Sequence, residues 1–143
     1  MKRCQIRPSC HFSLLVITNN PLVREACGKN ATDDFFRVEA RYVDGDVEHL
    51  LLKVRDMVHE GYPLLSHPLP ASIRMIYSPY RSVMLGASIG ELDLWYAETI
   101  EDSLRKYRRG TEYRIPTRVN DEDYKWMDMH LLSAALKEPR PFS

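Results

Sequence analysis

The chain has 143 residues, and its 20 lysines and arginines balance its 20 aspartates and glutamates, so the formal net charge is zero. This length suits one domain with one hydrophobic core. The neutral balance argues against nucleic acid as a partner, because proteins dedicated to nucleic acid carry a basic excess, and it gives no reason to expect binding to an anionic membrane.

We expect neither a transmembrane helix nor a signal sequence in this chain. The longest apolar run, Leu14 to Ile17, is too short for a transmembrane helix or a signal sequence. Three cysteines, an odd number, do not suit a disulfide scaffold, and they are Cys4, Cys10 and Cys27. We therefore expect a cytoplasmic protein.

The first part of the chain alternates between strand and helix patterns. Residues 13–18 are apolar and rich in β-branched side chains, as in a strand covered on both faces. Asn20 can cap a short helix that begins at Pro21 and runs to about Cys27. Residues 35–43 alternate imperfectly and predict a second strand.

The clearest helical pattern covers residues 47–60. Its apolar stripe consists of Val47, Leu50, Leu51, Val54 and Val58. Asp46 can cap this helix, Gly61 can end it, and residues 62–66 are expected to form a third strand. Two strand–helix–strand units in succession imply parallel pairing with right-handed crossovers.

A long loop and two further helices complete the expected fold. The loop at 67–79 precedes a fourth strand at 82–85, and loops of this length are often functional. The next helix is marked by Leu92, Trp95, Ile100, Leu104 and Tyr107. Asn120 can cap a last helix, which ends near Lys137. Its residues Trp126, Met127 and Met129 are expected to pack against the sheet, with a partner or dimer face as the alternative.

These elements predict an α/β fold of the Rossmann-like or flavodoxin-like kind. We expect a single three-layer domain with a short, mostly parallel sheet of about four strands, followed by C-terminal helices. Residues 1–12 form an N-terminal extension in this interpretation, and residues 13–143 form the domain. Its core spans 13–109, and its C-terminal helical segment spans 119–138.

Polar clusters follow the first and third predicted strands. In a parallel sheet with strand order 2-1-3, ligands bind between the carboxyl ends of strands one and three. Thr18, Asn19 and Asn20 follow the first strand, and Ser66 and His67 follow the third. The pattern predicts a site for a small anionic metabolite, since the first cluster also opens a helix. The alternative is that these residues only form turns and caps.

Two further residues bear on chemistry. His67 is the candidate acid–base residue, because imidazole titrates near neutral pH. No partner group for it is visible, so we favour binding over catalysis, and whether the chain is an enzyme stays open. Arg81 is expected to clamp a carboxylate or phosphate, or else to pair with a surface acid.

Metal-ligand residue types occur only near the start of the chain. Cys4, Cys10 and His11 have no second pair at a suitable spacing. We therefore predict no metal site, and the sequence identifies no cofactor.

Several short blocks in the same order resemble the GrdX family, which is named for glycine reductase gene clusters of amino-acid-fermenting anaerobic bacteria. The blocks are Thr18-Asn-Asn-Pro-Leu-Val23, Lys53-Val-Arg-Asp56, His59-Glu-Gly61, Leu64-Leu-Ser-His-Pro-Leu69, Pro79-Tyr-Arg-Ser-Val83 and Gly90-Glu-Leu-Asp-Leu94. The resemblance spans roughly residues 14–104. It implies an accessory role beside an amino-acid reductase, and it supplies no catalytic residues.

The sequence thus leads to one preferred function and one alternative. The preferred function is binding of a small anionic metabolite, such as an amino acid or a nucleotide, by Thr18, Asn19, Asn20, Ser66, His67 and Arg81. The alternative is a protein–protein interaction or assembly factor for an amino-acid reductase complex, which would use Trp95, Trp126 and the last helix. A protein partner or a second copy of the chain would then be the ligand.

Overall fold

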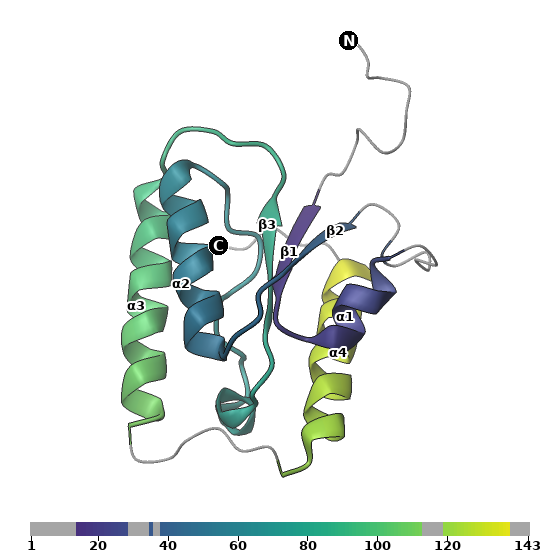
Figure 1. The fold of residues 1–143 in the computed structure, drawn as a ribbon. Coiled ribbons are helices and arrows are strands. Elements are labelled where there is room, and N and C mark those ends of the chain that lie inside the picture. Colours follow the sequence, from purple (N-terminus) through teal and green to yellow (C-terminus); the bar gives the residue numbers. More distant parts are fainter. Residues whose placement is uncertain (1–13, 29–34, 36–37, 113–118, 138–143) are drawn as a thin grey trace.

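The computed structural model describes residues 14–28, 35, 38–112 and 119–137 (Figure 1). Its elements in chain order are β1 (Leu14–Thr18), α1 (Pro21–Ala26), β2 (Val38–Tyr42), α2 (Val47–Glu60), the 3-10 helix η3 (Ile73–Tyr77), β3 (Ser82–Gly86), α3 (Leu94–Gly110) and α4 (Asp121–Lys137). The predicted extension at 1–12 lies outside the described residues.

The described sheet has three strands in the order β2-β1-β3 and is mixed. β1 and β2 run parallel, with Val16 opposite Ala40, whereas β1 and β3 run antiparallel, with Val16 opposite Met84. The α/β class is therefore correct, but the predicted mostly parallel, four-stranded, Rossmann-like sheet is wrong.

The difference has two causes: β3 runs antiparallel to β1, and the predicted third strand at 62–66 is not formed. Only Leu64 makes a bridge there, with Leu85, and the Leu65 N–H donates to the Met84 carbonyl at 2.9 Å. Pro63 has no N–H to donate, which limits pairing along this segment. The segment lies along the outer side of β3, so β3 separates it from β1 instead of continuing a parallel series.

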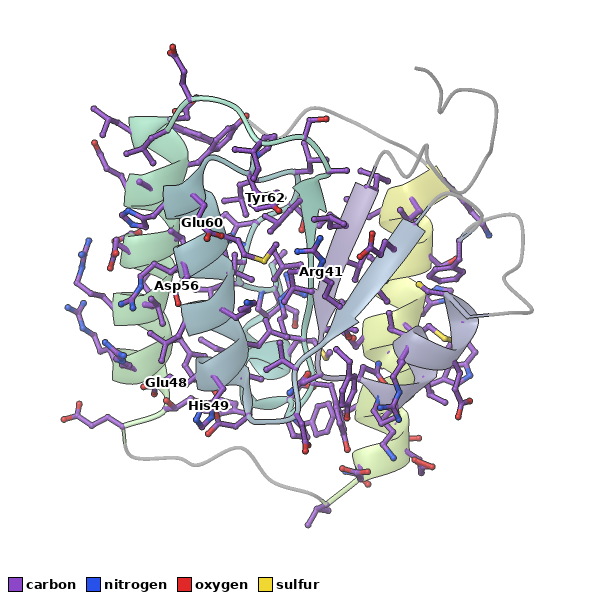
Figure 2. All side chains as sticks on the ribbon, turned by 45° about the horizontal axis from the view of Figure 1, so that its top comes forward. Arg41, Glu48, His49, Asp56, Glu60 and Tyr62 are labelled. Atoms are coloured by element: carbon purple, nitrogen blue, oxygen red, sulfur yellow. The ribbon has the colours of Figure 1, made fainter. Side chains whose placement is uncertain are left out.

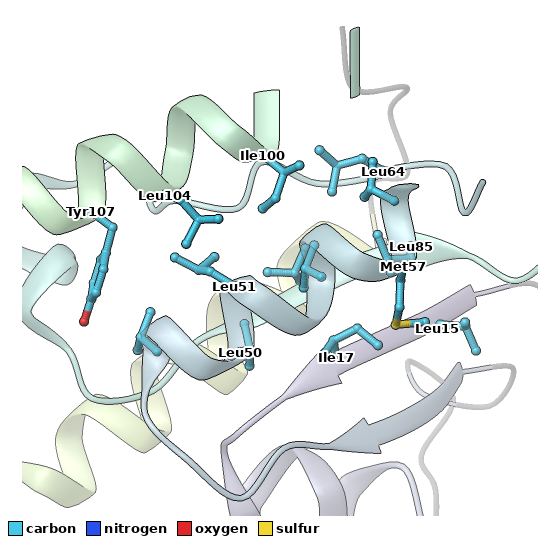
Figure 3. Packing of buried hydrophobic residues seen from close by; sticks show 14 residues of the cluster. Leu15, Ile17, Leu50, Leu51, Met57, Leu64, Leu85, Ile100, Leu104 and Tyr107 are labelled. Carbon is cyan, nitrogen blue, oxygen red and sulfur yellow. The ribbon is translucent and has the colours of Figure 1, made fainter. Parts of the chain in front are cut away.

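Helices cover both faces of the sheet (Figure 1). Leu15 and Ile17 of β1 point to the face covered by α2 and α3, and Val16 points to the face with α1 and α4. Figure 3 shows the larger cluster, in which the stripe of α2 meets Ile100 and Leu104 of α3. All five predicted stripe residues of α2 are buried.

The boundaries of α2 follow from its flanking residues. The Asp46 carboxylate accepts from the His49 N–H at 2.9 Å and caps the helix. Gly61 ends it with φ 113°, a left-handed conformation in which a Cβ atom would collide with the Gly90 carbonyl oxygen. Figure 2 shows the polar face of α2, where His49 and Asp56 are exposed.

The later helices correct two expectations. Ile100, Leu104 and Tyr107 form the buried stripe of α3 as predicted, but Trp95 is 46% exposed and does not belong to it. Leu92 is 47% exposed and lies before the helix. On α4, Trp126 is 56% exposed and Met127 is 42% exposed, so neither packs in the core. No helix among the described residues has both the length and the apolar character needed to cross a membrane.

Candidate functional site

Asn19 follows β1 and joins three segments of backbone. Its Nδ2 donates to the carbonyl oxygens of Gly45 at 3.0 Å and Pro79 at 2.9 Å, and its Oδ1 accepts from the Arg81 N–H at 2.9 Å. The side chain is buried, so these bonds satisfy groups that water cannot reach. Asn19 therefore fixes the position of the Arg81 backbone.

Asn20 connects α1 to α4. Its Oδ1 accepts from the Leu22 N–H at 3.0 Å, which confirms the predicted cap, and its Nδ2 donates to the Lys125 carbonyl oxygen at 2.8 Å. The same Nδ2 donates to Asp128 Oδ2 at 3.0 Å. Both the oxygen and the nitrogen of this side-chain amide are therefore hydrogen-bonded within the protein.

A chain of hydroxyl groups crosses from β1 to α4. The Thr18 and Ser82 hydroxyl oxygens are 2.8 Å apart, and Ser82 Oγ donates to Asp128 Oδ2 at 2.7 Å. Thr18 Oγ1 also accepts from the Asn20 N–H at 3.0 Å. All four residues are buried, so the chain forms a polar path inside the protein.

Asp128 is the buried acid at the end of this path and is only 2% exposed. Burial raises the pKa of its carboxyl group, against the opposing effect of the bonds from Asn20 and Ser82 and of the nearby Arg81 charge. Both side-chain bonds end on Oδ2. A backbone hydrogen bond from Ser82 adds to the contacts of the carboxylate.

Arg81 is held by the loop that follows residue 66. Its Nε donates to the Pro68 carbonyl oxygen and its Nη2 to that of His67, both at 2.8 Å. Burial lowers the pKa of the guanidinium, and the Asp128 charge opposes that effect. Arg81 and Asp128 make no direct ion pair within the described structure, so the expectation that Arg81 pairs with a surface acid is not what its contacts show.

His67 and Ser66 lie on the same loop. His67 Nδ1 accepts from the Leu69 N–H at 3.1 Å, and burial together with the Arg81 charge lowers the pKa of the imidazole. Ser66 Oγ accepts from the Met84 N–H at 2.9 Å. The neutral imidazole thus uses one ring nitrogen as an acceptor for the loop backbone, and this nitrogen is not available as a general base.

A pocket of about 470 Å³ lies between this loop, the start of β3 and α4. Its polar lining residues are Ser66, His67, Arg81, Ser82 and Asp128. Its apolar lining includes Leu69, Met84, Leu131, Leu132 and Ala135. The pocket therefore collects three of the six predicted site residues, while Thr18, Asn19 and Asn20 support it from behind through hydrogen bonds.

The position of this pocket differs from the predicted crevice between strands one and three. Because β3 lies next to β1, the pocket opens beyond β3, between residues 66–71 and α4. Sequence reasoning missed Ser82 and Asp128. One signal for Asp128 was its spacing: it lies four residues from Tyr124 and four from Leu132, on the inward side of α4.

A second hollow of about 300 Å³ lies at the carboxyl ends of β1 and β2. Its cation, Lys125, already pairs with Asp121 at 3.3 Å and Glu122 at 3.1 Å. The predicted anion site at the start of α1 also borders this hollow. That helix has six residues, begins with Pro21, and has its Leu22 N–H capped by Asn20, so few N–H groups are left for an anion.

The cysteines offer little further chemistry. Cys4, Cys10 and His11 lie outside the described residues. Cys27 is half-buried, and burial raises its pKa to about 11, so its thiol stays protonated at neutral pH. Within the described ranges, no group of three or more metal-ligating side chains could hold an ion.

Comparison with known proteins gives one family. The model of the GrdX-like protein family matches residues 15–137, which extends the earlier resemblance beyond residue 104 and includes α4 with Asp128. Neither the curated proteins nor the solved structures contain a match. Because the family model covers most of the sequence, the chain belongs to the GrdX-like protein family.

Proposed function

We propose that this GrdX-like protein binds a small anionic metabolite in the pocket between residues 66–71, β3 and α4. The observation that carries the proposal is the hydrogen bonding of the Arg81 guanidinium. Two loop carbonyls orient its guanidinium through Nε and Nη2, and Nη1 makes no hydrogen bond to the described residues. Arginine recognises carboxylate and phosphate through its fork of N–H groups.

The size and lining of the pocket support a small ligand. Its volume of about 470 Å³ falls within the range of roughly 300–1,000 Å³ that small-molecule sites occupy. Mostly apolar walls with a few convergent polar groups are typical of such sites. Ser66 and His67 complete the proposed polar contacts beside Arg81.

A thermal-shift screen of the full chain against carboxylates, amino acids and phosphates tests this function. A ligand at a hundred times its dissociation constant adds about 2.7 kcal/mol to the free energy of unfolding, a readily visible shift. The Arg81→Gln variant should lose the shift, whereas Arg109→Gln, which removes an exposed arginine at the end of α3, should keep it.

Arg81 also braces the loop, so a second variant avoids that complication. Ala71 is exposed at the rim of the pocket, and Ala71→Trp should block entry without removing any hydrogen bond. The proposal predicts wild-type melting temperature for this variant in the absence of ligand and no shift in its presence. A ligand that still shifts both Ala71→Trp and Arg81→Gln would bind elsewhere, and the proposal would be wrong.

The second candidate function is protein–protein interaction, and a group of exposed apolar side chains favours it. Leu94 is 69% exposed at the start of α3, next to Trp95, and Leu92 and Ile89 are exposed just before it. Apolar side chains that gather on a surface often mark a contact with another protein.

Co-purification with a tagged amino-acid reductase complex tests this alternative. The double variant Leu94→Ser/Trp95→Ser should abolish co-purification, and Ala71→Trp should leave it intact. Equal recovery of wild type and the double variant would exclude this surface as the site of contact.

A further inference from the structure

Two opposite charges face the same pocket without meeting. Asp128 of α4 and Arg81, the residue before β3, both line it. Asn20 and Ser82 hold the carboxylate, and the carbonyls of residues 67 and 68 hold the guanidinium. Neither group can therefore turn freely to pair with the other.

Each charged group makes its side-chain hydrogen bonds through only some of its polar atoms. Asp128 Oδ2 takes both recorded side-chain hydrogen bonds, and Arg81 uses Nε and Nη2. Asp128 Oδ1 and Arg81 Nη1 take part in none of these side-chain bonds, so each can offer a contact to a ligand. A simple anion bound to Arg81 would add a second negative charge near the buried Asp128 carboxylate, and a positive group on the same ligand would offset that charge.

We infer that the ligand carries an ammonium group as well as a carboxylate, and that it is a zwitterionic amino acid with an apolar side chain. Its carboxylate would bind Arg81 Nη1, and its ammonium group would donate to Asp128 Oδ1. This inference rests on the proposed function and makes it more specific.

The remaining walls indicate what the rest of the ligand is like. Leu69 of the loop and Met84 of β3 line the pocket, together with Leu131, Leu132 and Ala135 of α4. An apolar side chain would lose water on entering and would leave no polar group without a partner. A polar ligand side chain would find no charged partner, because the ammonium and carboxylate groups of the ligand would already bind Asp128 and Arg81.

Three ligands with the same branched apolar group test the inference by isothermal titration calorimetry on the wild-type full chain. L-leucine carries both charges, 4-methylpentanoate lacks the ammonium group, and 3-methylbutylamine lacks the carboxylate. We expect L-leucine to bind at least about tenfold more tightly than either relative, since each charge-assisted hydrogen bond in a buried site is strong.

The Asp128→Asn variant separates the two charges. Its side-chain oxygen can still accept from Asn20 and Ser82, while an NH₂ group replaces Oδ1 and cannot accept from an ammonium group. Affinity for L-leucine should fall about tenfold or more, and affinity for 4-methylpentanoate should not fall. An equal loss for both ligands would mean that Asp128 only supports the fold.

The outcomes distinguish this inference from the function on which it rests. If 4-methylpentanoate binds the wild type as tightly as L-leucine, the zwitterion is wrong but the anionic-metabolite function stands. If the amine binds as tightly as L-leucine, Arg81 has no role and both are wrong. If none of the three binds, while another carboxylate or phosphate shifts the melting temperature through Arg81, only the inference is overturned.

Discussion

The two faces of the sheet are built in different ways. The face covered by α2 and α3 carries a cluster of fourteen buried apolar residues. The face covered by α1 and α4 has a cluster of six, and beside it lie the buried polar chain from Thr18 to Asp128 and the pocket. The first face supplies most of the apolar burial that stabilises the fold, and the second holds the groups that chemistry can use.

The largest expected effect is on stability, and it compares one leucine from each face. Leu51→Ala on α2 should lower the free energy of unfolding by about 3–5 kcal/mol, because it leaves a cavity in close-packed surroundings. Leu132→Ala on α4 should cost only about 2–3 kcal/mol, because this side chain already borders a pocket. Urea denaturation of both variants measures the difference, and equal losses would contradict the contrast between the faces.

The next effect concerns the buried polar chain. Asp128→Ala removes the acceptor of the Asn20 amide and the Ser82 hydroxyl, so two buried donors lose a partner. We expect a loss of about 1–3 kcal/mol in the free energy of unfolding, measured by urea denaturation. Asp56→Ala, at an exposed position on α2, is the control and should change stability by about 0.5 kcal/mol or less. An equally small loss of stability in Asp128→Ala would mean that water takes over the hydrogen bonds of Asn20 and Ser82.

The difference between the faces also explains what the sequence could predict. The α2 helix was predicted at its observed boundaries because its local signals agree: Asp46 caps it, Gly61 ends it, and the apolar stripe is continuous. The strand at 62–66 was wrongly predicted, since a short apolar run does not reveal its neighbour or its direction. Only the fold shows that β3 lies between this segment and β1.

The candidate site was only partly visible for a related reason. Ser66 and His67 were predicted because they follow the expected third strand, and Arg81 because it comes just after the long loop, so all three rested on local features. Asp128 lies on a helix rich in charged residues, where an acid normally faces solvent. Its burial depends on Asn20 and Ser82, which are distant in the sequence. Long-range pairings of this kind leave no local pattern.

A third, smaller effect is the pH dependence of stability at Asp128. Its pKa is raised by burial in the folded state, so the folded protein binds this proton more tightly than the unfolded chain does. Relative to Asp128→Asn, wild-type stability should therefore fall as the pH rises above the ordinary aspartate pKa of about 3.9, and level off above the folded-state pKa. Urea denaturation at a series of pH values measures it. A relative stability that rises with pH would show that the Arg81 charge outweighs burial.

The smallest effect is expected at His67, at the mouth of the pocket. Burial and the Arg81 charge lower its pKa, so the unfolded chain takes up the proton first as the pH falls. Relative to His67→Asn, the wild type should lose stability as the pH falls below about 6.5, the ordinary pKa of histidine, and the loss ends below the folded-state pKa. His130→Asn, which removes an exposed imidazole from α4, is the matched control. Chemical denaturation between pH 5 and about 8 measures the sign. If the wild type instead gained stability as the pH fell, an acidic group near the loop would have to outweigh the Arg81 charge. The charge arrangement proposed for the pocket would then be wrong.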